Sequence, residues 1–541
     1  MLRTSPTGTP LGDDFHLYDT TLRDGAQREG ISYSVADKLA VARLLDALGV
    51  GFIEGGWPGA LPKDTEFFAR AAAGELELKH AALVAFGSTR RAGLTAAKDP
   101  QLQALLASRA PVVTVVAKAD RRHVERALRV DVAQACAMVA DTVALLVDEG
   151  RRVFLDAEHF FDGYAFDADC ALRVLEAAVT AGADVAVLCD TNGGQLPLQL
   201  AETVTEVVAR TGFRVGIHCQ DDTACAVANS VAAVQAGASH VQCTANGYGE
   251  RTGNADLFAV IGNLATKLGM PVLPEHGMAE LTRTSHALAE IANLAPDTHQ
   301  AYVGRSAFAH KAGLHASAIK VDPELYNHLD PVVVGNSQRV LVTEMAGRAS
   351  IELKAGELGL DLTGRSAEVG VVTARVKDLE ARGWSFEAAD ASFELLLRHE
   401  VDEVSPAPPF QLESYRVIVD HTTDGSVVAQ ATVTVHVAQE RVIATAEGNG
   451  PINAMDGALR QALGAHVPWL GSVSLSDYKV RILPGASGTD AVTRVLVDTS
   501  DGNDSWTTVG VHGNVVEASW LALLDAMTYA ALRHHGVAST A

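Results

Sequence analysis

The stretch Phe15-His16-Leu17-Tyr18-Asp19-Thr20-Thr21-Leu22-Arg23-Asp24-Gly25 sets a pattern that recurs through the first half of the chain. A short apolar run ends in a polar turn, and an Ala/Leu-rich segment of helical period follows it. Seven more apolar runs have the same setting and little polar alternation: 51–54, 81–86, 112–117, 153–158, 185–190, 215–218 and 240–244. This composition is typical of strands that are buried on both faces.

Eight strands that alternate with helices over about 250 residues fit a (β/α)₈ TIM barrel, while a doubly wound open sheet is the competing fold. Polar residues follow the carboxyl ends of many different strands, whereas an open sheet concentrates them at one switch point. We therefore expect the barrel. Local signals agree, because Ser34-Val35-Ala36-Asp37 resembles a capping box, and three glycines stand where helices should end: Gly49, Gly182 and Gly237.

The chain changes character twice after the barrel, which we assign to residues 14–280. Residues 281–404 are mostly of helical pattern, with a polar loop at 309–315, and we expect a small helical linker or lid region there. Ser405-Pro406-Ala407-Pro408-Pro409 then marks a second boundary.

The C-terminal region, residues 405–541, contains the same order of elements twice. Three strands of period two precede a helix at 452–463, and three more precede a helix that starts at Asn514. The two halves also align locally, as Tyr415-Arg416-Val417 against Tyr478-Lys479-Val480. We therefore expect a duplicated α/β domain. It holds no obvious catalytic cluster, which favours a dimerisation or ligand-sensing module.

Composition limits the function. The chain has 541 residues, 48% of them apolar and 20% charged, a profile typical of a soluble protein of two or three domains. The formal net charge of −23 repels nucleic acid and anionic membranes, so neither is an expected partner. The six cysteines form no CxxC pair, and residues 1–14 hold no signal-peptide core, which favours the cytoplasm. No apolar run is expected to span a membrane.

Polar side chains that follow three of the predicted strands form a candidate metal site. Asp24, beside Arg23, follows the first strand, His218 and Gln220 end the seventh, and Asn254 follows the eighth. Each piece alone has a plainer explanation, such as a surface ion pair or a structural histidine. In a barrel, however, the sheet closes between strands eight and one, so these side chains converge. A carboxylate, an imidazole and amide oxygens suit a divalent ion such as Mg²⁺ or Mn²⁺, with positions open for a substrate.

These residues resemble the signatures of the Claisen-condensing TIM-barrel enzymes, the 2-isopropylmalate, homocitrate and citramalate synthases. The resemblance covers nearly the whole chain, and the duplicated C-terminal region is similar to the family's amino-acid-sensing domain. The family motifs are Arg23-Asp24-Gly25, His218-x-Gln220, Gly249-Glu250-Arg251-Thr252-Gly253-Asn254 and Phe308-Ala309-His310-Lys311-Ala312-Gly313-Leu314-His315. Two segments look most like the citramalate synthase branch: Asp156-Ala157-Glu158-His159-Phe160-Phe161-Asp162-Gly163-Tyr164 and Ala85-Phe86-Gly87-Ser88-Thr89-Arg90-Arg91.

One position departs from the family pattern, which usually has His-x-His on the seventh strand where this chain has Gln220. An amide oxygen binds a hard divalent ion but is a weaker ligand for softer metals than an imidazole nitrogen. Three explanations stay open: Gln220 is a ligand and Mg²⁺ or Mn²⁺ is favoured, a water replaces it, or the site no longer catalyses. The other motif residues argue against the third.

The resemblance implies an acyltransferase that uses acetyl-CoA as donor and a 2-oxo acid as acceptor. Arg23 would hydrogen-bond the keto oxygen and stabilise the alkoxide that forms on attack. Thr191 would hold the acceptor carboxylate. His315, with Tyr326 nearby in sequence, is the candidate acid–base group. Glu158 is the alternative, or it orients a His315 that possibly comes from a partner subunit; the sequence does not rank these roles.

The citramalate branch implies pyruvate as acceptor, a homodimer, and feedback by isoleucine on a pathway to that amino acid. Three alternatives remain. A larger 2-oxo acid would make the chain a 2-isopropylmalate or homocitrate synthase, and a few pocket residues decide between them. A lyase of the hydroxymethylglutaryl-CoA type would need a mobile cysteine, and none follows Cys243. A metal-free amino-acid sensor would need no catalytic site.

Overall fold

The computed structural model describes residues 12–402, 406–421, 423–483 and 491–539. It divides into two compact units, Met1–Phe308 with Leu329–Ser337, and Ala309–His328 with Gln338–Ala541. The three segments expected from sequence stay a prediction. Ser405, at the second expected boundary, lies outside the described residues.

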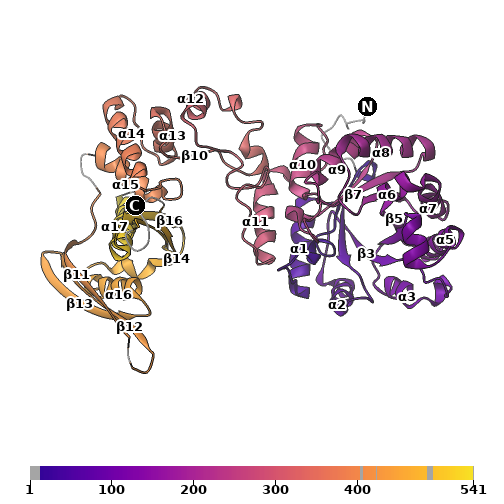
Figure 1. Cartoon of the computed structure of the whole chain (residues 1–541), viewed down its shortest axis with the longest axis horizontal. Helices are drawn as coiled ribbons and strands as arrows, with labels where there is room; N and C mark the ends of the chain where they lie inside the picture. The colour runs from indigo at the N-terminus through magenta and orange to yellow at the C-terminus, as the bar shows by residue number, and fades with distance from the viewer. Residues whose placement is uncertain (1–11, 403–405, 422, 484–490, 540–541) are drawn as a thin grey trace. The chain divides into compact units, whose positions relative to one another are not determined.

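The first unit is a closed barrel of eight parallel strands in sequence order, as predicted. Figure 1 shows these strands surrounded by helices in the indigo-to-magenta part of the chain. Each strand begins and ends within two residues of its expected range. The strands are β1 (His16–Asp19), β2 (Phe52–Gly56), β3 (Ala82–Ser88), β4 (Val112–Lys118), β5 (Arg152–Glu158), β6 (Val185–Asp190), β7 (Val215–Cys219) and β8 (His240–Cys243).

Helices follow each strand and form the outer layer of the barrel. They are α1 (Val35–Leu48), α2 (Pro62–Arg70), α3 (Pro100–Ala107), α4 (Arg121–His123), α5 (Val132–Asp148), α6 (Phe160–Phe166), α7 (Ala168–Thr180), α8 (Pro197–Thr211), α9 (Ala226–Gln235), α10 (Leu257–Thr266) and α11 (Leu281–Ile291). Helix α1 begins with the predicted capping box of Ser34 and Asp37, and Gly49 ends it in a left-handed conformation. These local signals fix where the chain leaves one strand and enters the next helix.

Two separate apolar cores stabilise this unit. One lies between the strands and the helices and contains most of the buried residues. The other fills the barrel interior, where Tyr18, Phe52 and Phe154 pack among smaller side chains. The buried Tyr18 hydroxyl hydrogen-bonds the Thr114 hydroxyl at 2.8 Å. The barrel therefore has a solid interior, and only its rim can hold a ligand.

The second unit begins with short helices and ends in a duplicated α/β domain. Its helical part contains β9 (Ala309–His310), α12 (Gly313–Val321), β10 (Arg339–Val340), α13 (Arg348–Glu357), α14 (Ser366–Ala381) and α15 (Asp390–Val401). The duplicated part contains β11 (Gln411–His421), β12 (Val427–Val437), β13 (Glu440–Gly448), α16 (Pro451–Leu463), β14 (Ser474–Ile482), β15 (Thr493–Ser500), β16 (Ser505–His512) and α17 (Val515–Ser539). The repeat of three strands and a helix is as predicted.

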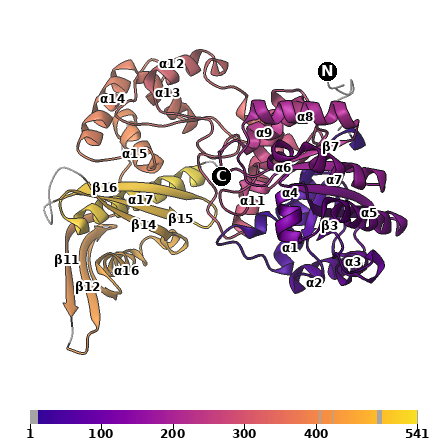
Figure 2. The same cartoon turned by 45° about the vertical axis from the view of Figure 1, so that its right-hand side comes forward.

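The two repeats share one apolar core, so they form a single domain. Helix α16 packs on the sheet β11–β12–β13, and α17 packs on β14–β15–β16 (Figure 2). Buried side chains of both sheets and both helices meet in that core, among them Val433, Leu459, Val497 and Leu523. Each sheet alone presents an apolar face that needs a partner, and the duplication supplies it.

One described helix meets the length and hydropathy criteria of a membrane span, although charged residues interrupt it. Among the described helices, Val515–His534 of α17 is long and apolar enough to cross a membrane, and the bent pair Arg121–Leu128 and Val132–Asp148 passes the same test if counted as one span. However, 56% of the apolar 18-residue stretch of α17 is buried within the protein. A core helix meets the same criteria, which explains why length and hydropathy select it.

The Tyr18–Thr114 pair gives a test of the barrel interior. Tyr18→Phe should destabilise the barrel by about 1–3 kcal/mol, because it leaves the buried Thr114 hydroxyl without a partner. The double variant Tyr18→Phe/Thr114→Val removes both polar groups and should be nearly as stable as the natural protein. Urea unfolding of the barrel transition measures both. A double variant that loses the sum of the two single losses would contradict the hydrogen bond.

Candidate active site

The predicted metal-binding residues meet at the carboxyl ends of β1, β7 and β8. The His218 Nε2 atom lies 3.3 Å from Asp24 Oδ2, and Gln220 Nε2 lies 3.4 Å from the same oxygen. Gln220 and Asn254 pair through an isolated backbone bridge. All four side chains are buried. The closure of the barrel between β1 and β8 thus brings Asp24 next to residues that are about 190 to 230 positions away in sequence.

Unpartnered polar atoms show that this cluster fits a cation. Gln220 Oε1 and both side-chain polar atoms of Asn254 are buried without a hydrogen-bond partner. A buried oxygen without a partner costs about 1–3 kcal/mol, which a bound cation would offset. No group of three or more His, Cys, Asp or Glu side chains with metal-binding geometry occurs in the described chain. The cluster of Asp24, His218, Gln220 and Asn254 is not such a group, because two of its four side chains are amides.

The electrostatics of Asp24 and His218 favour opposite charges. Burial favours the neutral acid, but the charge of Arg23 and the hydrogen bond with His218 lower the pKa of Asp24 to about 2. Burial opposes the imidazolium form, yet Asp24 raises the pKa of His218 above its ordinary value. The ionised Asp24 therefore lies next to the His218 imidazole, which binds either a proton or a cation. A divalent ion would take that position.

Arg23 is held rigidly at the rim. Its Nε lies 2.9 and 2.8 Å from the two carboxylate oxygens of Glu54 on β2. Thr20 also donates to Glu54, at 3.0 Å, and the guanidinium lies 3.9 Å from the centroid of the Phe86 ring. Burial opposes the charge, but Glu54 and Asp24 raise the pKa of Arg23. Its Nη1 also lies 3.8 Å from Asp24 Oδ1. These contacts fix the guanidinium at the cavity, where a planar group with several N–H donors can bind a carboxylate or an oxyanion.

Glu158 and Thr191 also lie at this rim. Glu158, at the end of β5, forms an ion pair with Lys118 at the end of β4, and the two residues are neighbours in register. The Thr191 hydroxyl accepts a hydrogen bond from the His159 backbone N–H at 2.8 Å. His159 has a left-handed backbone, with φ of 60°, which is uncommon for a residue other than glycine. The hydroxyl hydrogen of Thr191 is consequently left to donate to a ligand.

One cavity joins these residues. It has a volume of about 640 Å³, and Arg23, Asp24, Glu158, Thr191, His218 and Gln220 line it. Arg90, Arg91 and Lys118 add positive charge to its wall. Cationic and acidic side chains thus share the wall of this cavity in a net-negative protein, and the cations can attract an anionic ligand.

His315 and Tyr326 belong to the second unit. Their rings lie close together, with centroids 4.2 Å apart. The two residues that the family resemblance selects in this segment are thus neighbours in space as well as in sequence. Their roles in catalysis stay a prediction.

Four buried or partly buried polar residues of this region received no role from the sequence: Glu54, Lys118, Gln242 and Asp156, the last of which was quoted only as part of a family segment. Glu54 is the last residue of the expected strand 51–54 and lies in the middle of β2, so a carboxylate in an apolar strand was an available signal. Gln242 is a strand residue with no neighbouring motif, and only the fold shows its contacts. Burial and then the charge of Glu54 raise the pKa of Asp156 to about 7.

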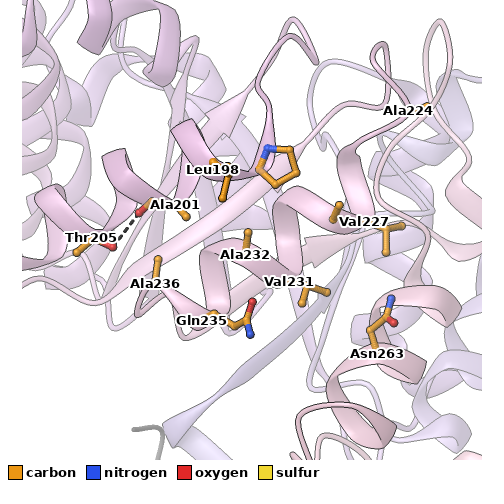
Figure 3. Close-up of a pocket in the computed structure, with 12 residues that line it drawn as sticks. Leu198, Ala201, Thr205, Ala224, Val227, Val231, Ala232, Gln235, Ala236 and Asn263 are labelled. Carbon is orange, nitrogen blue, oxygen red and sulfur yellow. Dashed lines mark hydrogen bonds between the residues drawn. The ribbon is translucent and has the colours of Figure 1, made fainter.

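A second hollow, of about 780 Å³, lies on the outside of the barrel (Figure 3). Leu198, Ala201 and Thr205 of α8 face Val231 and Ala232 of α9 across it. Its lining contains no titratable side chain. It therefore lacks the groups that acid–base or metal chemistry needs, and the rim cavity is the candidate active site.

A closed (β/α)₈ barrel with polar residues at its carboxyl-terminal rim defines a TIM-barrel enzyme. Comparisons with protein families agree: residues 14–291 match the HMGL-like family, 302–383 the homocitrate synthase post-HMGL domain-like family, and 387–531 the LeuA allosteric (dimerisation) domain.

Comparison with curated relatives specifies the family within the TIM-barrel enzymes. The chain is 62% identical to the (R)-citramalate synthase of Streptomyces coelicolor, over 97% of this chain and 98% of the relative. It is 48% identical to the (R)-citramalate synthase of Synechocystis, over 95% of each chain. A probable 2-isopropylmalate synthase of Methanopyrus kandleri is 32% identical, over 97% of this chain and 99% of the relative. The chain belongs to the (R)-citramalate synthase family.

A substitution at Gly253, next to Asn254, tests whether this loop holds the candidate metal site. Its φ is +100°, and a Cβ atom there would lie 2.0 Å from the Gly247 carbonyl oxygen. Gly253→Ala should shift Asn254 and weaken Mn²⁺ binding by about tenfold or more, which corresponds to ~1.4 kcal/mol. Gly74→Ala is the control, because Gly74 has a similar φ of +91° and open space around it. Calorimetric titration with Mn²⁺ measures both, and equal affinities in the two variants would contradict the proposed role of this loop.

Proposed function

We propose that this chain is a divalent-metal-dependent (R)-citramalate synthase, which condenses acetyl-CoA with pyruvate and releases CoA. The observation that carries the proposal is the meeting of Arg23, Asp24, His218 and Gln220 in one cavity with Glu158 and Thr191. The family match supports the reaction class, and relatives of 62% and 48% identity named (R)-citramalate synthase support pyruvate as acceptor.

Asp24, His218, Gln220 and Asn254 would hold the ion, with Mn²⁺ or Mg²⁺ favoured because three of the four ligand atoms are oxygens. When bound, the ion supplies positive charge that polarises the carbonyl group of the acceptor. Both metals tolerate amide and carboxylate oxygens, and both leave coordination positions for a substrate. Softer metals would bind this set less strongly than a set with two imidazoles.

Arg23 and Thr191 would bind and activate the acceptor. The Thr191 hydroxyl already accepts from His159, so its hydrogen can donate to the pyruvate carboxylate. Arg23 would hydrogen-bond the keto oxygen and stabilise the negative charge that develops on it when the new carbon–carbon bond forms. The Glu54 carboxylate and the Phe86 ring fix the guanidinium in advance, so little reorganisation is needed.

Removal of a proton from the acetyl methyl group needs a base, and Glu158 and His315 are the candidates. Glu158 lies in the cavity and contacts Lys118. His315 lies in the second unit beside Tyr326. Attack of the resulting enolate on the keto carbon gives a thioester, and water then cleaves the thioester to citramalate and free CoA. This hydrolysis makes the overall reaction effectively irreversible.

The C-terminal domain would regulate the enzyme. Its match to an allosteric dimerisation domain supports a homodimer whose activity an amino acid controls. We propose isoleucine as the feedback inhibitor, isoleucine formation as the pathway, and the cytoplasm as the location. The larger 2-oxo acids of 2-isopropylmalate and homocitrate synthases remain the competing acceptors, and the assay below separates them.

The proposal predicts metal-dependent release of CoA from acetyl-CoA. With Mn²⁺ or Mg²⁺ present, release should be fastest with pyruvate, compared with 2-oxobutyrate, 2-oxoisovalerate and 2-oxoglutarate. Chelation should abolish it, and His218→Ala should lower kcat/KM by about 10²-fold or more, since a first ligand is lost. His276→Ala, at an exposed histidine of the same unit, should have no effect. A thiol-reactive dye measures the free CoA.

The other outcomes are equally informative. A preference for a different acid would keep the condensing mechanism and reject pyruvate as the substrate. No release from folded, metal-loaded protein with any acid would reject the synthase and favour a non-catalytic sensor.

Gln220→His tests whether Gln220 is a ligand. An imidazole at this position should tighten binding of Zn²⁺ and Co²⁺ by about tenfold or more relative to Mg²⁺, because nitrogen suits these metals better than an amide oxygen. Gln27→His is the matched control, because Gln27 lines the same cavity outside the cluster. Competition titrations measure the preferences. If the metal preference is the same in both variants and the natural protein, Gln220 is not a ligand.

A further inference from the structure

A chain of hydrogen bonds crosses the barrel interior behind the proposed metal site. His218 Nδ1, on β7, lies 2.7 Å from Gln242 Oε1, on β8. Gln242 Nε2 then donates to Asp156 Oδ1, on β5, at 2.8 Å. Strands β5 and β8 are not neighbours in the sheet, so the amide spans the interior. All three side chains are buried, and Gln242 is only 1% exposed.

The direction of these bonds follows from which atoms can donate. The amide nitrogen of Gln242 donates to Asp156, whose carboxylate oxygen accepts. The amide oxygen then faces His218 and needs a donor, which places a hydrogen on His218 Nδ1. In the neutral imidazole, the lone pair is consequently on Nε2, the atom that lies 3.3 Å from Asp24. The chain therefore selects the tautomer of His218 that can bind a cation beside Asp24.

We propose that Gln242 and Asp156 are positioning residues that fix the ring orientation and tautomer of His218 for the metal ion. This inference rests on the proposed function, because it assumes that His218 is a ligand. Second-sphere acceptors of this kind orient metal-bound imidazoles, and their loss lowers metal affinity by about 10–100-fold. The Asp156 carboxylate also polarises the Gln242 amide, and this polarisation makes His218 Nε2 a stronger electron donor.

A purely structural role for Gln242 makes a different prediction. A buried amide that only fills the barrel interior affects stability, and metal affinity would not depend on its hydrogen bonds. The two roles are separated by measuring Mn²⁺ affinity and thermal stability on the same variants, without using activity.

Gln242→Met keeps the size of the side chain and removes both hydrogen bonds. In the full-length protein, we expect the Mn²⁺ dissociation constant, measured by electron paramagnetic resonance titration, to rise about 10–100-fold. The matched control is Gln300→Met, because the Gln300 amide also bridges two polar side chains of the barrel unit, Asn246 and Asp256, away from the cavity. Its Mn²⁺ affinity should equal that of the natural protein.

A swap of the two groups is the decisive variant. Gln242→Glu/Asp156→Asn exchanges the amide and the carboxylate, so the introduced carboxylate accepts from His218 Nδ1 and the introduced amide donates to it. Mn²⁺ affinity should return to within about threefold of the natural value, while Gln242→Glu alone places two carboxylates together and should not recover.

Three outcomes are distinguishable. Loss in Gln242→Met with recovery in the swap supports the inference. Natural affinity in a folded Gln242→Met, or no recovery in a folded swap, overturns it and leaves the proposed function standing. A natural protein that binds no Mn²⁺ or Mg²⁺ overturns both. Circular dichroism and melting temperature of the metal-free proteins confirm that each variant is folded.

Discussion

The parallel pairing of β1 with β8 is the constraint on which the rest of the candidate site depends. It aligns Asp19 with Cys243 and closes the sheet. The loop after β1, which carries Arg23 and Asp24, is thereby placed beside the ends of β7 and β8. Without this closure, the single carboxylate of the cluster would have no imidazole or amide next to it. The strand ends that close the barrel therefore also carry the residues of the candidate metal site.

Charge organisation follows from the same geometry. The protein carries a net charge of −23, yet Arg23, Lys118, Arg90 and Arg91 face one cavity. Acidic residues form ion pairs with two of these cations: the buried Glu54 binds Arg23, and the partly exposed Glu158 binds Lys118. An anionic substrate would consequently meet fixed positive groups in a protein whose overall field repels it. The proposed divalent ion would add to this local reversal of charge.

The fold could be predicted from sequence because its signals are local. The run Val185–Asp190 is apolar up to its last residue, Asp190, and the predicted range of β6 equals the observed one. The period-two strands and the repeated positions of Tyr415 and Tyr478 predicted the duplicated domain. Helix α17 was harder, since a buried core helix and a membrane span have the same length and hydropathy. Sequence alone does not contain the contacts that separate them.

The site was predicted in part, and the limit is physical. Asp24, His218, Gln220 and Asn254 follow strand ends, so the topology alone brings them together. Gln242 and Asp156 act through side-chain contacts across the barrel interior, and no spacing along the chain encodes which inward residues touch. His315 lies in the second unit, so no pattern within the barrel sequence indicates whether its side chain reaches a substrate at the barrel rim.

The central claim is that a divalent ion is bound by Asp24, His218, Gln220 and Asn254 at the barrel rim. Anomalous X-ray scattering from crystals of the Mn²⁺-loaded protein tests it most directly. The account predicts one strong manganese peak in each barrel, within coordination distance of about 2.0–2.4 Å from an atom of each of the four side chains. A peak elsewhere, or a fully loaded crystal without a peak at this rim, would contradict it.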